Sequence, residues 1–189
     1  MRYDPSNPRN RGSRIVGKIK IGSIETEIPI AWSRDDSIFM EEFLKNTKNG
    51  WVFIDNQINI NRLGMNTVIF DYNALNGQLY DHLNNSLHTP EVNESLNIRI
   101  TTPEEKMKFR ICSVYHKKFD DWKSYRQFFH EEKDRHEFVD HLRHKNELKR
   151  LENTEVSIYH NFLTISVFQK TNEKGCNLIV QARLITEDE

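Results

Sequence analysis

Apolar and polar residues alternate in short runs near both ends of this 189-residue chain, and this alternation limits the fold more than any other feature. In residues 14–21 the isoleucines and Gly17 recur at every second position, as in a β-strand with one buried face. Gly22 and Ser23 then favour a turn, and residues 24–30 alternate again, so the two runs predict a β-hairpin. Pro29 lacks a backbone donor, which places the second strand at an edge or ends it.

Further strands are predicted through the middle and at the end of the chain, where short runs are rich in Val, Ile, Leu and aromatic residues. These runs are residues 51–54, 57–60, 67–72, 96–101, 106–115, 155–159, 162–169 and 177–185. Short helices are expected at 36–45, after a polar cluster rich in N-cap residues, and around 78–83. Most of the predicted strands therefore lie on either side of the segment 120–152.

The segment 120–152 contains neither Gly nor Pro, and its apolar residues recur at helical spacing. A fully polar stretch at 130–135 interrupts this apolar stripe. The pattern predicts either one long helix with an exposed middle or two helices with a break there.

These elements together predict an α+β fold. Mostly antiparallel strands from both ends of the chain form a sheet or a small barrel, and the long or broken helix at 120–152 packs on it. We expect residues 14–189 to form one domain, with a possible sub-boundary near 88–104. Residues 1–20 carry six Lys or Arg and one Asp, and residues 1–13 are expected to be a disordered basic arm.

The composition excludes several classes of protein. No apolar run approaches the ~18 residues that a membrane-spanning helix needs, so we expect no membrane partner. The N-terminus lacks the apolar stretch of a secretory signal, which predicts an intracellular protein, cytoplasmic or nuclear. The two cysteines, Cys112 and Cys176, are too few for a disulfide framework or a complete zinc site, and no cofactor is expected.

Signatures of common enzyme classes are missing from the sequence. No nucleophile elbow, P-loop, dinucleotide fingerprint or H-E-x-x-H motif occurs among the 189 residues. Cys112 and His116 share one face of a predicted strand, but at this spacing they lie about 13 Å apart, too far for a catalytic pair. The sequence therefore predicts no catalytic residues.

A metal site is one hypothesis for the histidine-rich stretch. Glu137, His141 and His144 follow the spacing i, i+4, i+7, so they share one helix face and offer a carboxylate and two imidazoles. No second segment supplies further ligands at a recognisable spacing. The same residues also fit a solvated helix face with charged pairs.

Nucleic-acid binding is a second hypothesis, because basic and aromatic residues are interleaved along the chain. Cations contact phosphates and aromatic rings stack on bases. The candidate residues are Arg9, Arg11, Arg14, Lys106, Lys108, Arg110, Lys117, Lys118, Trp122, Lys123 and Tyr125. In the alternative interpretation the aromatic residues are the core side of the helix and the lysines its solvated side, which agrees with a pI near 6.7.

By elimination, the sequence favours a non-catalytic binding or adaptor module that acts through protein–protein interaction. The helix 120–152 and the edge strand 24–30 are the surfaces expected to bind another protein. A single-stranded RNA- or DNA-binding accessory protein is the alternative.

Overall fold

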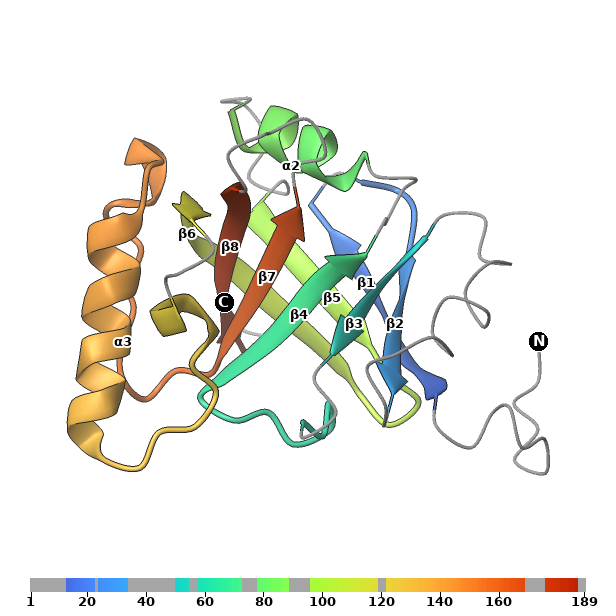
Figure 1. Ribbon diagram of the computed structural model, residues 1–189, viewed down its shortest axis with the longest axis horizontal. Helices are drawn as coiled ribbons and strands as arrows, with labels where there is room; N and C mark the ends of the chain where they lie inside the picture. Colours follow the sequence, from blue (N-terminus) through green and yellow to red (C-terminus); the bar gives the residue numbers. More distant parts are fainter. Residues whose placement is uncertain are drawn as a thin grey trace.

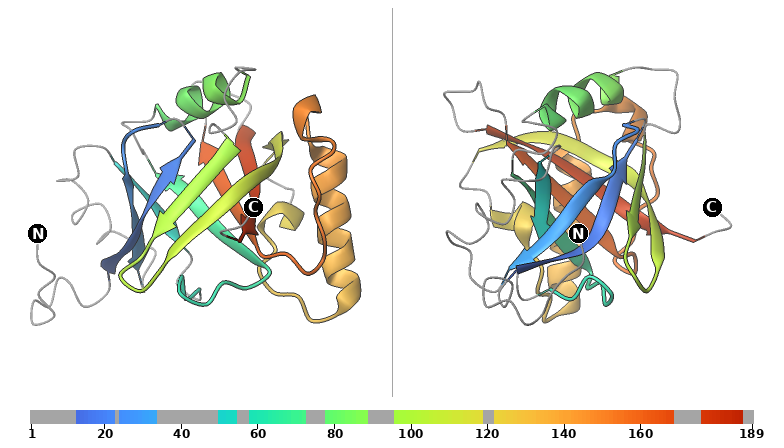
Figure 2. Two further views of the ribbon diagram at one scale, coloured as in Figure 1. Left: turned by 180° about the vertical axis from the view of Figure 1, so that it is seen from behind. Right: turned by 90° about the vertical axis from the view of Figure 1, so that its right-hand side faces the viewer.

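The computed structural model describes residues 13–22, 24–33, 50–54, 58–72, 78–88, 96–118, 122–168 and 176–186. Eight strands close into a barrel in the order β1-β2-β3-β4-β7-β8-β6-β5 (Figure 1). The strands are β1 (Ser13–Ile21), β2 (Ile28–Ser33), β3 (Trp51–Ile54), β4 (Asn66–Tyr72), β5 (Asn97–Thr101), β6 (Lys106–Lys118), β7 (Phe162–Phe168) and β8 (Cys176–Ile185). Figure 2 shows from two further sides how the strands wrap around one core.

The predicted hairpin at the start of the chain is present, because β1 and β2 pair antiparallel with Lys18 opposite Pro29. The second strand is not at an edge, however. On its other side β2 pairs parallel with β3, with Ile30 opposite Val52, so closure of the barrel covers the expected edge.

The barrel interior is filled by the apolar positions of the alternating strands, as the period of two requires. Ile19, Ile30, Ile69 and Ile165 are each fully buried in the main core. The helix α2 (Leu79–His88) lies across one end of the barrel, at the top of Figure 1. Its Leu83 joins the same core, so α2 acts as the apolar cover of that end.

The connection from β6 to β7 lies on the outside of the barrel (Figure 1). It contains the 3-10 helices η4 (Trp122–Tyr125) and η5 (Lys149–Leu151) and the helix α3 (Glu132–Lys145). The apolar face of α3 forms a second core against the outer wall of the barrel. This core contains Met65, Cys112, Phe138, Val139, Leu142, Val156, Ile158 and Phe162.

The predicted fold class is wrong: the chain is a closed β-barrel with short helices, not an α+β fold with a long helix at 120–152. The long helix is not formed because residues 126–131 make a non-helical connection. Asp134 stabilises it, since one carboxylate oxygen accepts the backbone N–H groups of His130 and Glu131 and the other accepts from Arg126. These bonds start α3 at Glu132 rather than near residue 120.

Other local predictions have mixed outcomes. Residues 155–157 are irregular and 158–159 form a turn instead of a strand, and residues 58–60 of the predicted strand 57–60 are not in a strand. The predicted helix 36–45 and residues 1–12 of the predicted arm 1–13 lie outside the described residues, and Ser13 is the first residue of β1. None of the helices in the described part is long and apolar enough to cross a membrane.

Candidate functional site

A group of buried polar side chains lies on the outer wall of the barrel, where β6 and β7 end and β8 begins. We call Lys117, Tyr125, Ser166 and Asn177 the wall cluster. Asn177 donates to Ser166 Oγ at 3.0 Å and to Tyr125 Oη at 3.3 Å, and these two oxygens lie 3.0 Å apart. Lys117 Nζ lies 3.3 Å from the centroid of the Tyr125 ring. The four residues come from four different elements and form one connected site.

Strand alternation explains why this site is on the wall and not in the core. In β7 the residues Leu163, Ile165 and Val167 belong to the inner core, so Ser166 points to the outer face. Pairing of β6 with β8 then sets Lys117 opposite Asn177 on the same face. The short helix η4 brings Tyr125 over this face from outside, where its ring also contacts Phe70 at 5.5 Å between centroids.

The wall cluster has unused hydrogen-bonding capacity. Asn177 Oδ1 is buried and accepts no hydrogen bond from the described residues. A buried acceptor without a donor costs about 1–3 kcal/mol, which a ligand that supplies an N–H group would recover. Lys117 places an ammonium group in the same environment although only 3% of the residue is exposed. The cluster can therefore accept one backbone N–H and favour a carbonyl or carboxylate oxygen nearby.

A second group of hydrogen-bonded polar side chains lies on the same wall, toward the other end of β7. Thr164 donates to Asn66 Oδ1 at 2.8 Å and accepts from Gln181 Nε2 at 3.2 Å. Asn66 Nδ2 donates to the backbone carbonyl of Arg126 at 2.8 Å. This group attaches the segment after η4 to the barrel wall and so holds Tyr125 in place.

A histidine with two hydrogen-bond partners lies at the same end of β6. His116 Nδ1 is 2.9 Å from Glu147 Oε2, and His116 Nε2 is 2.9 Å from Tyr80 Oη of α2. Glu147 also accepts the backbone N–H of His116 through its second oxygen at 3.0 Å, which fixes the carboxylate beside the ring. A carboxylate at Nδ1 orients an imidazole for proton transfer at Nε2.

The strand register places this histidine near the second cysteine of the chain. His116 lies opposite Leu178, and Lys118 lies opposite Cys176, so the backbone of Cys176 is one diagonal step from His116. Cys176 also directly precedes Asn177 of the wall cluster. The side chain of Cys176 lies outside the described part of the structure.

The other cysteine, Cys112, is chemically inert. Its side chain is buried beneath α3, and its thiol lies 3.4 Å from the backbone carbonyl of Gln181. Burial raises the pKa of the Cys112 thiol to about 12, and the nearby Arg183 offsets only part of this effect. A thiol with so high a pKa is not a nucleophile near neutral pH.

The structure separates the residues predicted to bind nucleic acid. Lys106, Lys108 and Arg110 share the outer face of β6, but Lys117 lies seven residues beyond Arg110, about 23 Å along the strand. Lys117 is buried under the half-buried Tyr125, so this ring is engaged by the wall and does not offer a stacking surface.

The remaining basic candidates are also dispersed. Arg14 packs over Trp32 at the opposite end of the barrel, and Lys123 is exposed on η4. Arg9, Arg11 and the side chains of Lys118 and Trp122 lie outside the described residues.

The proposed metal ligands on α3 are not brought together as a site. Glu137 faces Arg126 at 3.6 Å, and His144 Nδ1 lies 2.7 Å from the backbone carbonyl of Asp140. His141 packs edge-on against Tyr115. Within the described ranges, no three His, Cys, Asp or Glu side chains gather as metal ligands.

Sequence reasoning missed Ser166 and Asn177 of the wall cluster. Their signal is present but weak: polar residues interrupt otherwise apolar strands at alternate positions, as Thr164 and Ser166 do in β7 and Asn177 and Gln181 do in β8. This alternation indicates a polar outer face. It does not show that this face is covered, which depends on η4 and α3.

No protein-family model matches the chain, and no curated protein is similar enough to count as a match. Solved structures do match. The Clostridium perfringens sortase B structure has a TM-score of 0.74 at 18% identity and covers 94% of this chain and 96% of that chain. The Staphylococcus aureus sortase B–substrate complex has a TM-score of 0.73 at 19% identity and covers 92% of this chain and 80% of that chain. Sortase B from B. anthracis in complex with AAEK1 has a TM-score of 0.71 at 18% identity and covers 95% of this chain and 81% of that chain.

At these identities the likenesses establish the fold of the chain, a sortase B-like barrel. They also contradict the predicted non-catalytic adaptor and its nucleic-acid-binding alternative, because the structural neighbours are enzymes. The expectation that the chain is more likely not an enzyme is contradicted for the same reason. That expectation depends mainly on the absence of known enzyme motifs from the sequence. A motif is visible in a sequence only when the reacting groups lie close together along the chain.

Proposed function

We propose that this protein acts on a protein or peptide substrate by a sortase-type reaction at a cysteine thiol, and that the wall cluster binds another, extended part of that substrate. The likeness to sortase B over more than nine-tenths of the chain carries this proposal. One of the matching structures is a substrate complex, and another is a complex with triglycine. A protein partner was also expected from the sequence, and a peptide segment of a protein substrate is such a partner.

The wall cluster supports the binding half of the proposal. An extended peptide presents N–H and C=O groups in alternation, and Asn177 Oδ1 is a buried acceptor without a donor among the described residues. The ammonium group of Lys117 provides a favourable electrostatic environment for a peptide carbonyl oxygen. Ser166 and Tyr125 orient the Asn177 amide, because both accept from its Nδ2.

Elimination supports the choice of thiol. Sortases are cysteine transpeptidases, and this chain has two cysteines. Cys112 is buried, with its pKa raised to about 12, so thiol chemistry in this chain requires Cys176. His116, held by Glu147, lies one diagonal step from Cys176 in the strand register and is the base that we assign to it.

The reaction follows from these assignments. The Cys176 thiol gives its proton to His116, and the thiolate attacks a peptide carbonyl carbon. The C–N bond breaks, the leaving amine takes the proton from His116, and a thioester remains on the protein. A second amine attacks the thioester, forms the new amide bond and restores the thiol.

The transfer half is tested with a library of labelled peptides and triglycine as the amine acceptor, with mass spectrometry of the products. We expect peptides extended by triglycine with wild-type protein and with Cys112→Ser, and none with Cys176→Ser. If the wild-type protein forms no product and no thioester from any peptide, the transfer reaction is wrong.

The binding half is tested separately by isolating labelled peptides retained by the Cys176→Ser protein. Affinity should fall about tenfold in Asn177→Leu, because this variant loses the free acceptor, which corresponds to ~1.4 kcal/mol. Asn153→Leu, an exposed asparagine that lies in neither the wall cluster nor the pocket described below, is the matched control and should bind like the parent. Equal binding by all three proteins would remove the wall cluster from the proposal.

A further inference from the structure

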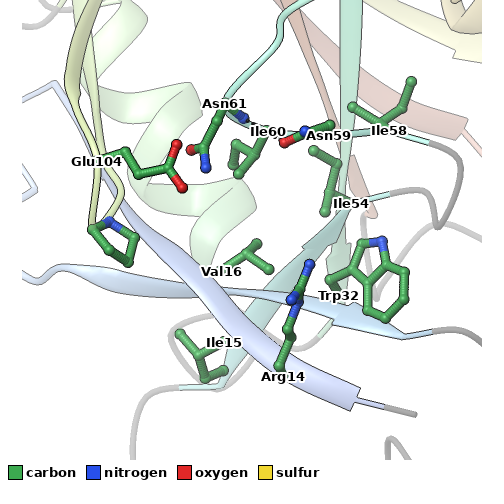
Figure 3. Close-up of a pocket in the computed structure, with 11 residues that line it drawn as sticks. Arg14, Ile15, Val16, Trp32, Ile54, Ile58, Asn59, Ile60, Asn61 and Glu104 are labelled. Atoms are coloured by element: carbon green, nitrogen blue, oxygen red, sulfur yellow. Dashed lines mark hydrogen bonds between the residues drawn. The ribbon is translucent and has the colours of Figure 1, made fainter.

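A pocket of about 480 Å³ lies at the end of the barrel opposite α2, away from the wall cluster (Figure 3). It is formed where β1 begins, where β2 and β3 end, and where the turn joins β5 to β6. Its volume is within the ~300–1,000 Å³ of small-molecule sites, and barrel mouths commonly hold such ligands.

The pocket has an apolar wall between two charged ends. Val16 and Ile54 lie in the middle, where they meet the main core. Figure 3 shows the Arg14 side chain rising beside Trp32 on one side and the Glu104 carboxylate on the other. The Arg14 guanidinium lies 5.0 Å from the centroid of the Trp32 ring, which leaves its N–H groups available at the edge.

The two charged groups have opposite sign and do not neutralise each other. Among the residues that the structure describes, neither Arg14 nor Glu104 has an ion-pair partner. Asn61 lies beside Glu104 in Figure 3, and its Oδ1 is buried without a hydrogen-bond donor in the described part of the chain. One end therefore offers two oxygen acceptors, and the other offers guanidinium donors.

This arrangement selects a ligand with a cation at one end, an anion at the other and an apolar group between them. A single amino acid carries both charges on one carbon and has no apolar segment between them, whereas the pocket has an apolar wall between its charged ends. A peptide of two or three residues separates its termini by up to ~3.3–3.6 Å per residue and places an apolar side chain against the apolar wall.

We propose that this pocket binds a short peptide with free termini. Its ammonium group donates to the Glu104 carboxylate and to Asn61 Oδ1, and its carboxylate accepts from the Arg14 guanidinium. The site is independent of the proposed transfer reaction, because it lies at the other end of the barrel and shares no residue with the wall cluster.

The test is isothermal titration calorimetry of the full chain with the tripeptide Gly-Leu-Gly, its N-acetylated form and its C-terminal amide. For the wild-type protein, each modification should weaken binding about tenfold, the loss of one charge-assisted contact. Glu104→Gln should weaken binding of the free tripeptide by the same factor, and this variant should bind the free and N-acetylated forms equally. Arg14→Gln should likewise bind the free acid and the amide equally.

Glu105→Gln is the matched control, because Glu105 is exposed on the same turn and does not line the pocket. It should bind all three peptides like the wild-type protein. Absence of saturable binding, or equal affinity of the wild-type protein for free and blocked peptides, would overturn the proposal. If Glu105→Gln weakens binding as much as Glu104→Gln does, the binding depends on general surface charge and not on this pocket.

Discussion

The thiol of Cys112 should be almost unreactive in the folded protein, and a Cys176→Ser variant makes it the single thiol of the chain. Burial raises its pKa from 9.0 to about 12, mainly by desolvation of the thiolate. At pH 8 a thiol with a pKa of 9.0 is about 10% ionised, whereas one with a pKa of 12 is about 0.01% ionised. The reactive fraction is therefore about 10³-fold smaller, before steric exclusion by α3 is added.

The assay is the rate of reaction with Ellman's reagent at pH 8, measured for Cys176→Ser in buffer and in guanidinium chloride. Folded protein should react at least about 10³-fold more slowly than unfolded protein, because the thiolate fraction differs by this factor. The Cys112→Ser variant reports on Cys176 under the same conditions and should react readily when folded, as a catalytic thiol must.

A rate for folded Cys176→Ser within tenfold of the unfolded rate would refute this reasoning. Cys112 would then be accessible and ionisable, and its exclusion as the nucleophile, on which the assignment to Cys176 depends, would be lost. A slow Cys176 thiol in Cys112→Ser would instead leave the burial of Cys112 intact and count against the transfer reaction alone.

Four further variants test local packing and hydrogen bonding in the fold, each by chemical or thermal unfolding. Asn66→Ala removes two hydrogen bonds from buried partners and should destabilise the fold by about 1–3 kcal/mol in urea titrations. Gly17→Ala places a Cβ 2.8 Å from the Thr101 carbonyl oxygen and should cost about 1–3 kcal/mol, whereas Gly64→Ala, with its nearest atom at 3.9 Å, should cost much less. The pKa of Asp134 is lowered, mainly by the backbone N–H of His130. The ionised carboxylate therefore stabilises the fold above pH 3.8, and this stabilisation is lost as the pH falls through the folded pKa. In Asp134→Asn the melting temperature should depend less on pH in this range.

Much of the strand content could be predicted because alternation is a local property. The runs 14–21, 67–72, 162–169 and 177–185 coincide with β1, β4, β7 and β8 to within one or two residues. The run 155–159 alternates equally well but forms irregular structure and a turn at 158–159. Its Val156 and Ile158 are buried in the second core beside α3, so their apolar side chains serve helix packing and not a strand ladder.

The candidate site could not be predicted in the same way. Lys117 and Tyr125 were predicted as nucleic-acid contacts because their charge and aromatic character are visible in sequence. Their actual partners, Ser166 and Asn177, are 41 or more residues further along the chain. Nothing local to Ser166 distinguishes it from an ordinary polar residue on the solvent side of a strand.

The sequence by itself determined most of the segments that become strands, because the side chains of a strand alternate between two faces and the apolar face must be buried. Only the tertiary structure decided the order of those strands. The parallel pairs β2–β3 and β4–β7 join segments that no local signal connects, and they close the barrel. Closure then places β6, β7 and β8 side by side, so that η4 covers Ser166 and Asn177 and turns an ordinary polar face into a buried site.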